Sequence, residues 1–232
     1  MKEVRINNVT SYLKEISPLG PFTMYRGQTH DWPLLPSIGR YPKTVCGYED
    51  WKTFHDQIIE EFLRLGRPHF QSYPEKIEGW ILAQHYGVPT RLLDTTTNPL
   101  KALFFAVDNS VNEVDGVVWA IEFNGWRTEL LEQHSKFWEN EICPYLPAQY
   151  NPRLTAQEGA FILCPLPENK APMFELDKVK VENIKYSKII VPREFKPDIR
   201  RELDILGCNN RLLFPDLSGV AKGIKLTDLQ EG

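Results

Sequence analysis

Apolar residues recur along the chain with helical spacing in some stretches and in short unbroken runs in others. The clearest helical pattern covers residues 49–65, where Trp51, Phe54 and Ile58 begin a series of apolar positions three or four residues apart, and Gly66 marks its end. Further helices are expected over residues 8–16, 74–87, 99–107, 126–139 and 195–206.

Short apolar runs bounded by turn residues predict the strands. They are expected at residues 22–27, 90–94, 116–123, 160–164 and 186–192. Residues 143–152 and the proline-bearing stretch 165–181 are interpreted as loops. Because no internal repeat, low-complexity tract or linker divides the sequence, we predict a single α+β domain over residues 1–232.

The composition changes this picture in two ways. With 42% hydrophobic residues and a formal net charge of -4, the chain can bury a large core and carries no overall basic field for nucleic acid, although a local basic patch is not excluded. The first residues lack the apolar segment of a signal peptide, and no run approaches the roughly 18 apolar residues of a membrane span. We therefore expect a cytoplasmic protein that does not associate with membranes.

Several common catalytic and metal-binding patterns are absent from the sequence. It contains no glycine-rich dinucleotide fingerprint, P-loop, H-E-x-x-H motif or nucleophile elbow. The four cysteines lie far apart and the five histidines show no ligand spacing, so we expect reduced thiols and no metal. His55, on an apolar helix face, is interpreted as a core or boundary histidine.

The stretch from Leu82 to Val107 is predicted to combine a helix end, a short apolar strand, a polar turn and the start of a buried helix. Asn98 and Pro99 form an N-cap and N1 pair, so the turn 94–97 precedes a buried helix. The free N–H groups of that helix and three threonine hydroxyls could hold a phosphate or a ribose. The same groups could instead only cap the helix and close the turn, and their spacing does not distinguish the two.

Two other places offer candidate site residues. Arg26 beside Gly27 at a strand end could bind a phosphate or carboxylate, or could pair with Asp31 on the surface. Gln157 and Glu158 precede the strand at 160–164, where a carboxylate could act as a base or stabilise a cationic transition state, or could be a solvated turn residue.

Four segments together resemble the FRG domain family, which is named after a Phe/Tyr-Arg-Gly motif. They are Tyr25-Arg26-Gly27; the run from Gln84 to Asp94; Asn98-Pro99-Leu100 with Ala102, Phe105 and Ala106; and Phe214-Pro215-Asp216-Leu217. The resemblance spans roughly residues 20–220, and the long central motif is specific.

FRG proteins occur in bacteria and phages, sometimes near defence or toxin genes, and their motif order is similar to that of ADP-ribosyltransferases. The resemblance therefore implies an ADP-ribosyltransferase-like fold with a central, mostly antiparallel sheet, continuous or split, flanked by helices. It also implies NAD as the substrate, transfer to a protein or nucleic acid acceptor, and a toxin or defence role with an antitoxin or other regulatory partner. No metal is implied.

The resemblance also suggests roles for single residues. Arg26 would hold the diphosphate or ribose of NAD, and Glu158 or Gln157 would take the carboxylate position of the catalytic site. The Gln-Glu-Gly order differs from the usual Gln/Glu-x-Glu spacing, which leaves the catalytic carboxylate open. The further residues implied to contact NAD are Tyr25, Gly27, His85, Arg91, Asp94, Thr95, Thr96 and Thr97.

The competing interpretation is a non-catalytic module that binds a nucleotide or a partner protein in the same pocket. It is favoured if Gln157 occupies the carboxylate position while Glu158 points to solvent. A hydrolytic enzyme that uses Asp94, His85 and Glu158 has little support, because no metal or nucleophile spacing accompanies these residues. For His85 alone, the default is a structural role in the last turn of a helix.

Overall fold

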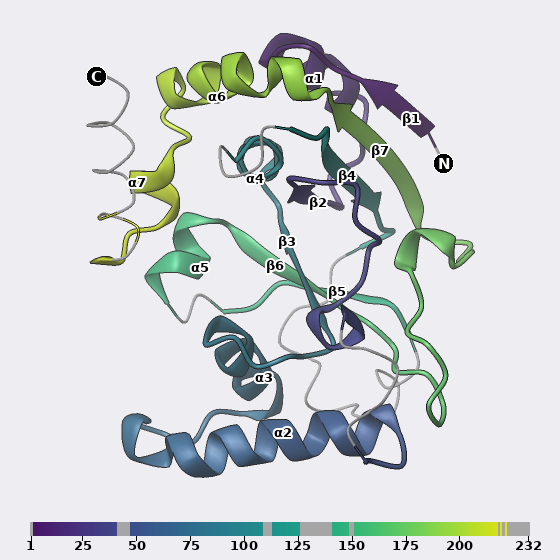
Figure 1. Cartoon of the computed structure of the whole chain (residues 1–232), viewed down its shortest axis with the longest axis vertical. Helices are drawn as coiled ribbons and strands as arrows, with labels where there is room; N and C mark the ends of the chain where they lie inside the picture. The colour runs from purple at the N-terminus through teal and green to yellow at the C-terminus, as the bar shows by residue number, and fades with distance from the viewer. Residues whose placement is uncertain are drawn as a thin grey trace.

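The computed structural model describes residues 2–40, 47–108, 113–125, 141–148 and 151–217, together with 219 and 221. The helix predicted over residues 126–139 lies outside this part of the chain. The helices are α1 Val9–Ile16, α2 Trp51–Gly66, α3 Lys76–His85, α4 Pro99–Ala106, α5 Pro152–Ala156, α6 Lys196–Ile205 and α7 Asn210–Leu213. Figure 1 shows α1 and α6 at one end of the molecule and α2 with α3 at the other.

The described strands form one open sheet in the order β1-β7-β4-β2-β3-β6-β5. Their bounds are β1 Lys2–Arg5, β2 Thr23–Gln28, β3 Leu92–Thr96, β4 Gly116–Glu122, β5 Cys143–Tyr145, β6 Gly159–Leu163 and β7 Lys185–Val191. The β1–β7 pair is parallel and every other pair among these strands is antiparallel. The predicted α+β class with a mostly antiparallel sheet is therefore confirmed.

The pairing between β2 and β3 is the shortest strand pairing in this sheet. In the described residues these two strands are paired at one position, where Tyr25 lies opposite Thr96. On either side of this pairing, the β2–β4 ladder runs from Thr23 to Gln28 and the β3–β6 ladder from Leu92 to Thr96. The sheet is thus continuous, but β2 and β3 separate beyond their single contact.

Two short strands and two short α-helices of the described residues were not predicted from the sequence. The interpretation of residues 143–152 as a loop was wrong, because Cys143–Tyr145 forms β5 and Pro152–Ala156 forms α5. Among the described strands β5 lies at the edge of the sheet and pairs on one side only, so Pro144 stands where proline is tolerated. β1 and α7 were also missed, since each has only four residues and gives almost no periodic signal.

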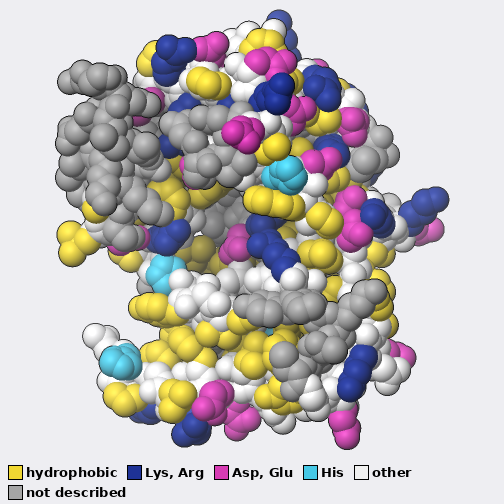
Figure 2. All heavy atoms as spheres, in the orientation of Figure 1, with side chains coloured by type: hydrophobic (Ala, Val, Ile, Leu, Met, Phe, Trp, Pro, Cys, Tyr) yellow, Lys and Arg dark blue, Asp and Glu magenta, His cyan; other side chains and the backbone are white. Residues whose placement is uncertain are grey.

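Apolar side chains pack on both faces of the sheet. On one face, α1, α4 and α6 cover β2, β4 and β7, while α3 and the end of α2 cover β3, β5 and β6. The other face packs against residues 34–38 and the start of α2. On the face of the molecule drawn in Figure 2, hydrophobic side chains gather over the end formed by α2 and α3, and charges of both signs are intermixed elsewhere.

Helix α4 lies unusually close to the sheet because two glycines face it. A Cβ atom on Gly27 of β2 would stand 1.8 Å from the backbone oxygen of Ala102, and one on Gly116 of β4 would stand 2.2 Å from that of Ala106. Such distances exclude any side chain at these positions. The glycine of the Tyr-Arg-Gly motif is therefore explained by packing: it lets the backbone of α4 rest on the backbone of β2.

None of the helices in the described ranges is long and apolar enough to cross a membrane.

Candidate functional site

A pocket of about 390 Å³ lies where β2 and β3 separate, between α3 and α4 on one face of the sheet. Its apolar lining includes the rings of Tyr25, Phe105 and Phe161. Its polar lining includes Arg26, Gln84, His85, Asp94, Arg153 and Gln157. The size and the mixture of aromatic walls with a few polar groups are typical of small-molecule sites.

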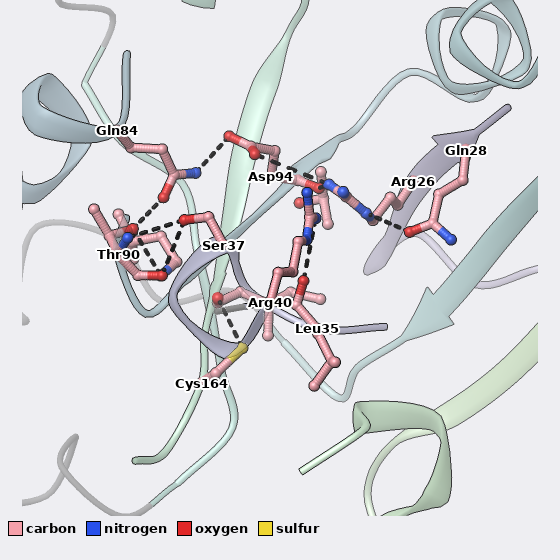
Figure 3. A network of polar contacts seen from close by, with 12 residues as sticks. Arg26, Gln28, Leu35, Ser37, Arg40, Gln84, Thr90, Asp94 and Cys164 are labelled. Carbon is pink, nitrogen blue, oxygen red and sulfur yellow. Dashed lines mark hydrogen bonds and ion pairs between the residues drawn. The ribbon is translucent and has the colours of Figure 1, made fainter. Parts of the chain in front are cut away.

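Arg26 stands across the opening between β2 and β3. Its Nη1 donates to the backbone oxygen of Asp94 at 2.6 Å, and its Nε donates to Oε1 of Gln28 at 3.0 Å (Figure 3). Burial lowers the pKa of Arg26 to about 10 against the opposing effect of Asp94, so the guanidinium stays cationic at neutral pH. Because a single residue pair joins the two strands, this side chain bridges a place where the backbone ladder is missing.

Asp94 is held by a chain of hydrogen bonds that starts from buried Thr90 (Figure 3). The backbone N–H of Leu92 donates to Oγ1 of Thr90 at 3.0 Å, and the Thr90 hydroxyl donates to Oε1 of Gln84. The Gln84 amide then donates to Oδ1 of Asp94 at 2.6 Å. The Asp94 side chain is 63% exposed, so the fixed carboxylate remains accessible from the pocket.

The end of α3 places Gln84 and His85 at the pocket. Gly87 adopts φ +88°, and the N–H groups of Val88 and Gly87 donate to the carbonyls of Ala83 and Gln84 at 2.9 and 3.0 Å. This is a Schellman motif, in which a left-handed glycine closes the helix. His85 is the last residue of α3 and also lines the pocket, so a structural position and a binding role are compatible.

The prediction of a turn at residues 94–97 was wrong for residues 94–96, which belong to β3. The threonines at the end of this strand and the cap of α4 make most of their contacts within the protein. Oδ1 of Asn98 accepts from the N–H groups of Leu100 and Lys101 at 3.0 and 3.3 Å. Thr96 Oγ1 donates to the Gln157 carbonyl at 2.7 Å and accepts from the Asn98 N–H at 3.0 Å. These contacts are what the capping interpretation requires, and they use the groups that a phosphate at the α4 N-terminus would need.

The other two threonines also bind within the protein. The Thr95 hydroxyl is buried against Sδ of Met24 at 3.4 Å, and the N–H of Thr97 donates to the carbonyl of Glu158 at 3.1 Å. Thr95 and Thr96 are part of the pocket wall, whereas Thr97 is not among its lining residues.

Gln157 and Glu158 take different places in the structure. Gln157 lines the pocket, and its side-chain amide donates to the Leu213 carbonyl at 3.1 Å. Glu158, at φ +45°, is not part of the pocket wall, and its Oε1 lies 2.8 Å from Nζ of Lys101 and 3.0 Å from Nδ2 of Asn98. Burial acts to raise the pKa of Glu158, but the hydrogen bonds from Lys101 and Asn98 outweigh it and lower the pKa.

Arg91 is not among the residues that line the pocket. It is buried, and its Nε donates to the Cys164 carbonyl at 2.7 Å while its guanidinium lies 5.9 Å from the centre of the Trp80 ring. These contacts tie β3 and its neighbour to α3. We therefore assign Arg91 a part in supporting the pocket wall.

Sequence reasoning missed Arg153 as a pocket residue. It lies on α5, and its guanidinium is 4.6 Å from the centre of the Phe214 ring. A signal was available: Asn151 and Pro152 repeat the N-cap and N1 pair that correctly located α4, and Asn151 Oδ1 accepts from Leu154 N at 2.8 Å. Arg153 adds a second arginine, so the described residues that line the pocket include two arginines and one carboxylate.

Comparison with known families matches residues 22–115 to the FRG domain. The matched segment contains the motifs that place Arg26, Gln84 and Asp94 at the pocket, and it ends just before β4. The chain matches no curated protein and no solved structure. Residues 22–115, less than half of the chain, therefore match the FRG domain.

Proposed function

We propose that the pocket of this protein binds a nucleotide, with NAD as the first candidate. Arg26 and Arg153 supply positive charge for phosphate oxygens, and a guanidinium in a partly buried place binds them more strongly than one on the surface. Tyr25, Phe105 and Phe161 offer aromatic surface for a base or a nicotinamide ring.

The position of Glu158 bears on whether the pocket only binds NAD or also cleaves it. Cleavage of the bond between nicotinamide and ribose builds positive charge on the sugar, so a catalytic carboxylate must face the bound sugar. Glu158 is instead engaged by Lys101 and Asn98, and Gln157 takes the place in the pocket wall. This arrangement favours binding without turnover by the Gln157 and Glu158 pair.

Calorimetric titration with NAD, ADP-ribose, AMP and inorganic phosphate tests the proposal. We expect binding of at least one nucleotide, and a loss of about tenfold to a hundredfold in affinity for Arg26→Ala, as for a charge-assisted hydrogen bond. Arg64→Ala is the matched control, because Arg64 is an exposed arginine of α2 paired with Glu61. The proposal fails if none of the four ligands binds, or if both arginine variants bind like the parent.

A second function is an NAD-consuming transferase in which Asp94 supplies the carboxylate. The observation in its favour is that Asp94 reaches the pocket beside Arg26, with its Oδ2 3.9 Å from Nη1 of Arg26. In that reaction the bond between the ribose C1′ and nicotinamide breaks, and nicotinamide leaves with the electron pair. The acceptor or water then bonds to C1′ and loses a proton, while Asp94 stabilises the cationic sugar.

Release of nicotinamide from NAD distinguishes the two functions. Under the binding function no release occurs, whereas under the transferase function Asp94→Asn abolishes it and Glu158→Gln leaves most of it. Asp198→Asn, at an exposed aspartate of α6, is the control for a general charge effect. If Glu158→Gln abolishes release while Asp94→Asn does not, the assignment of the carboxylate to Asp94 is wrong.

A toxin or defence role in the cytoplasm, regulated by an antitoxin or another partner, remains the cellular proposal that the FRG resemblance suggests. Induced expression of the parent should slow growth, and Arg26→Ala at equal protein level should relieve this. Equal growth of cells that express either protein would speak against the pocket as the source of toxicity.

A further inference from the structure

The hydrogen bonds from Thr90 to Asp94 run in one direction. Thr90 accepts from the N–H of Leu92, so its single hydroxyl proton is free to donate to Gln84 Oε1. With its oxygen used in this way, the Gln84 amide can only present its NH₂ group to Asp94. The buried end of the chain therefore fixes the orientation of an amide that lies between the core and the pocket.

This arrangement leaves Asp94 with one oxygen held and the other available. Oδ1 accepts from Gln84 at 2.6 Å, while Oδ2 lies 3.9 Å from Arg26 Nη1, which is beyond hydrogen-bond distance. Arg26 Nη1 donates instead to the backbone oxygen of Asp94. An accessible carboxylate oxygen in a fixed place can accept hydrogen bonds from a ligand without first breaking one within the protein.

We propose that Asp94 accepts hydrogen bonds from the ribose hydroxyls of the bound nucleotide, so that the pocket selects ribonucleotides over nucleotides that lack these hydroxyls. This inference rests on the proposed nucleotide binding and adds the substrate class. Asp94 contacts the ligand, and Gln84 and Thr90 are positioning residues that act through it. Thr90 is fully buried, so it has no contact with the ligand of its own.

The neighbouring guanidinium favours a diol over a cation at Asp94. A positively charged ligand group would lie near Arg26 and be repelled by it, whereas an uncharged hydroxyl donates to the carboxylate without that cost. In a nucleotide the phosphate is attached to the same ribose that carries the hydroxyls, so a site for one lies close to a site for the other. The carboxylate of Asp94 next to the guanidinium of Arg26 matches this arrangement. A carboxylate that binds ribose hydroxyls is common in dinucleotide sites.

The experiment compares ADP with 2′,3′-dideoxy-ADP by calorimetric titration. The parent should bind the dideoxy ligand at least about tenfold more weakly, because that ligand lacks the two hydroxyls that donate to the charged Asp94 carboxylate. In Asp94→Asn this ratio should fall below about threefold. Arg26→Ala should lower the affinity for both ligands, since both carry the phosphate that Arg26 contacts. The ratio of the two affinities should stay above about threefold.

The positioning role has its own test. Thr90→Val removes the hydroxyl that orients Gln84, and we expect the ratio between the two ligands to fall with little change in the affinity for the dideoxy ligand. Thr90→Ser keeps the hydroxyl and should restore the ratio. A merely structural effect would instead weaken both ligands equally. Asp198→Asn should behave like the parent, and thermal unfolding of each variant checks that it is folded.

Three outcomes would overturn the inference in different ways. If the parent binds ADP and dideoxy-ADP with equal affinity, ribose recognition by Asp94 is wrong while nucleotide binding stands. If the parent binds neither ligand nor any of the ligands above, the proposed function fails and the inference fails with it. A ratio that persists unchanged in Asp94→Asn would assign the selectivity to another residue and also count against the proposal.

Discussion

Arg26 binds the main chain of Asp94 more closely than its side chain. Nη1 lies 2.6 Å from the backbone oxygen and 3.9 Å from Oδ2. A guanidinium that is 14% exposed thus donates a charge-assisted hydrogen bond to a carbonyl, while the carboxylate of the same residue stays 63% exposed. The two residues are coupled mainly through the backbone, and this has a measurable consequence.

We expect substitution of these two residues to affect stability unequally. Arg26→Ala should lower the free energy of unfolding by about 2 kcal/mol, as for the loss of a hydrogen bond from a charged group at a partly buried place. Asp94→Ala should cost less than about 1 kcal/mol, because an exposed ion pair contributes little. Urea unfolding of both variants measures this. Equal losses would mean that the carboxylate, and not the carbonyl, is the main partner.

Gly27 should tolerate no side chain. In Gly27→Ala the new Cβ would meet the backbone of α4, which cannot move aside like the end of a flexible side chain, so we expect a loss of about 3 kcal/mol or more. Gly20→Ala is the matched control, since its Cβ would be in ordinary contact, 3.7 Å from Oε2 of Glu122. Urea unfolding would refute the packing explanation if the two variants were equally stable.

The N-cap of α4 should contribute to stability through Asn98. In Asn98→Ala two backbone N–H groups lose their acceptor and Glu158 loses one donor, and we expect a cost of about 1 to 2 kcal/mol. Asn183→Ala removes an exposed asparagine that accepts from Asn124, and it should change the free energy of unfolding by less than about 0.5 kcal/mol. Similar values for both variants would show that the cap is dispensable.

His55 should make the protein less stable in mild acid. Burial lowers the pKa of this histidine from its usual 6.5, although Asp56 opposes the effect. The unfolded chain therefore binds a proton below about pH 6.5 that the folded chain binds only at lower pH, so stability falls as the pH drops through this window. Urea unfolding at several pH values should show this fall in the parent and a smaller one in His55→Phe.

The control for this measurement is His69→Gln, at an exposed position next to α2. Its pH profile should follow that of the parent. His55→Phe also keeps an aromatic ring in edge contact with Trp80, whose centre lies 4.9 Å from that of His55. A parallel pH profile for parent and His55→Phe would place the origin of the acid sensitivity elsewhere.

Local signals were enough to predict most helices and the inner strands. The apolar pattern located α2, and Asn98 with Pro99 begins α4, as the residue types suggested. β1 and β5 gave no such signal, because a four-residue polar strand and a three-residue strand with a proline owe their form to their neighbours.

The site could be predicted only in part. The motif residues Arg26 and Asp94 are 68 positions apart and meet because β2 and β3 become neighbours, which no local pattern reveals. The turn at Glu158 depends on a positive φ at a residue that rarely adopts one, and this turn accompanies the pairing of its side chain with Lys101. Periodicity could not indicate either feature.

Because β2 and β3 are paired at a single position, we expect the sheet to open most easily between these two strands. Each half is held by its own ladder, whereas the halves are joined by one backbone pair, by Arg26 and by packing of α4 on both strands. The fewest main-chain hydrogen bonds would have to break at this line. Amide hydrogens of β3 near Asp94 are therefore expected to exchange with solvent sooner than those of β4, and a ligand that spans the line would slow that exchange.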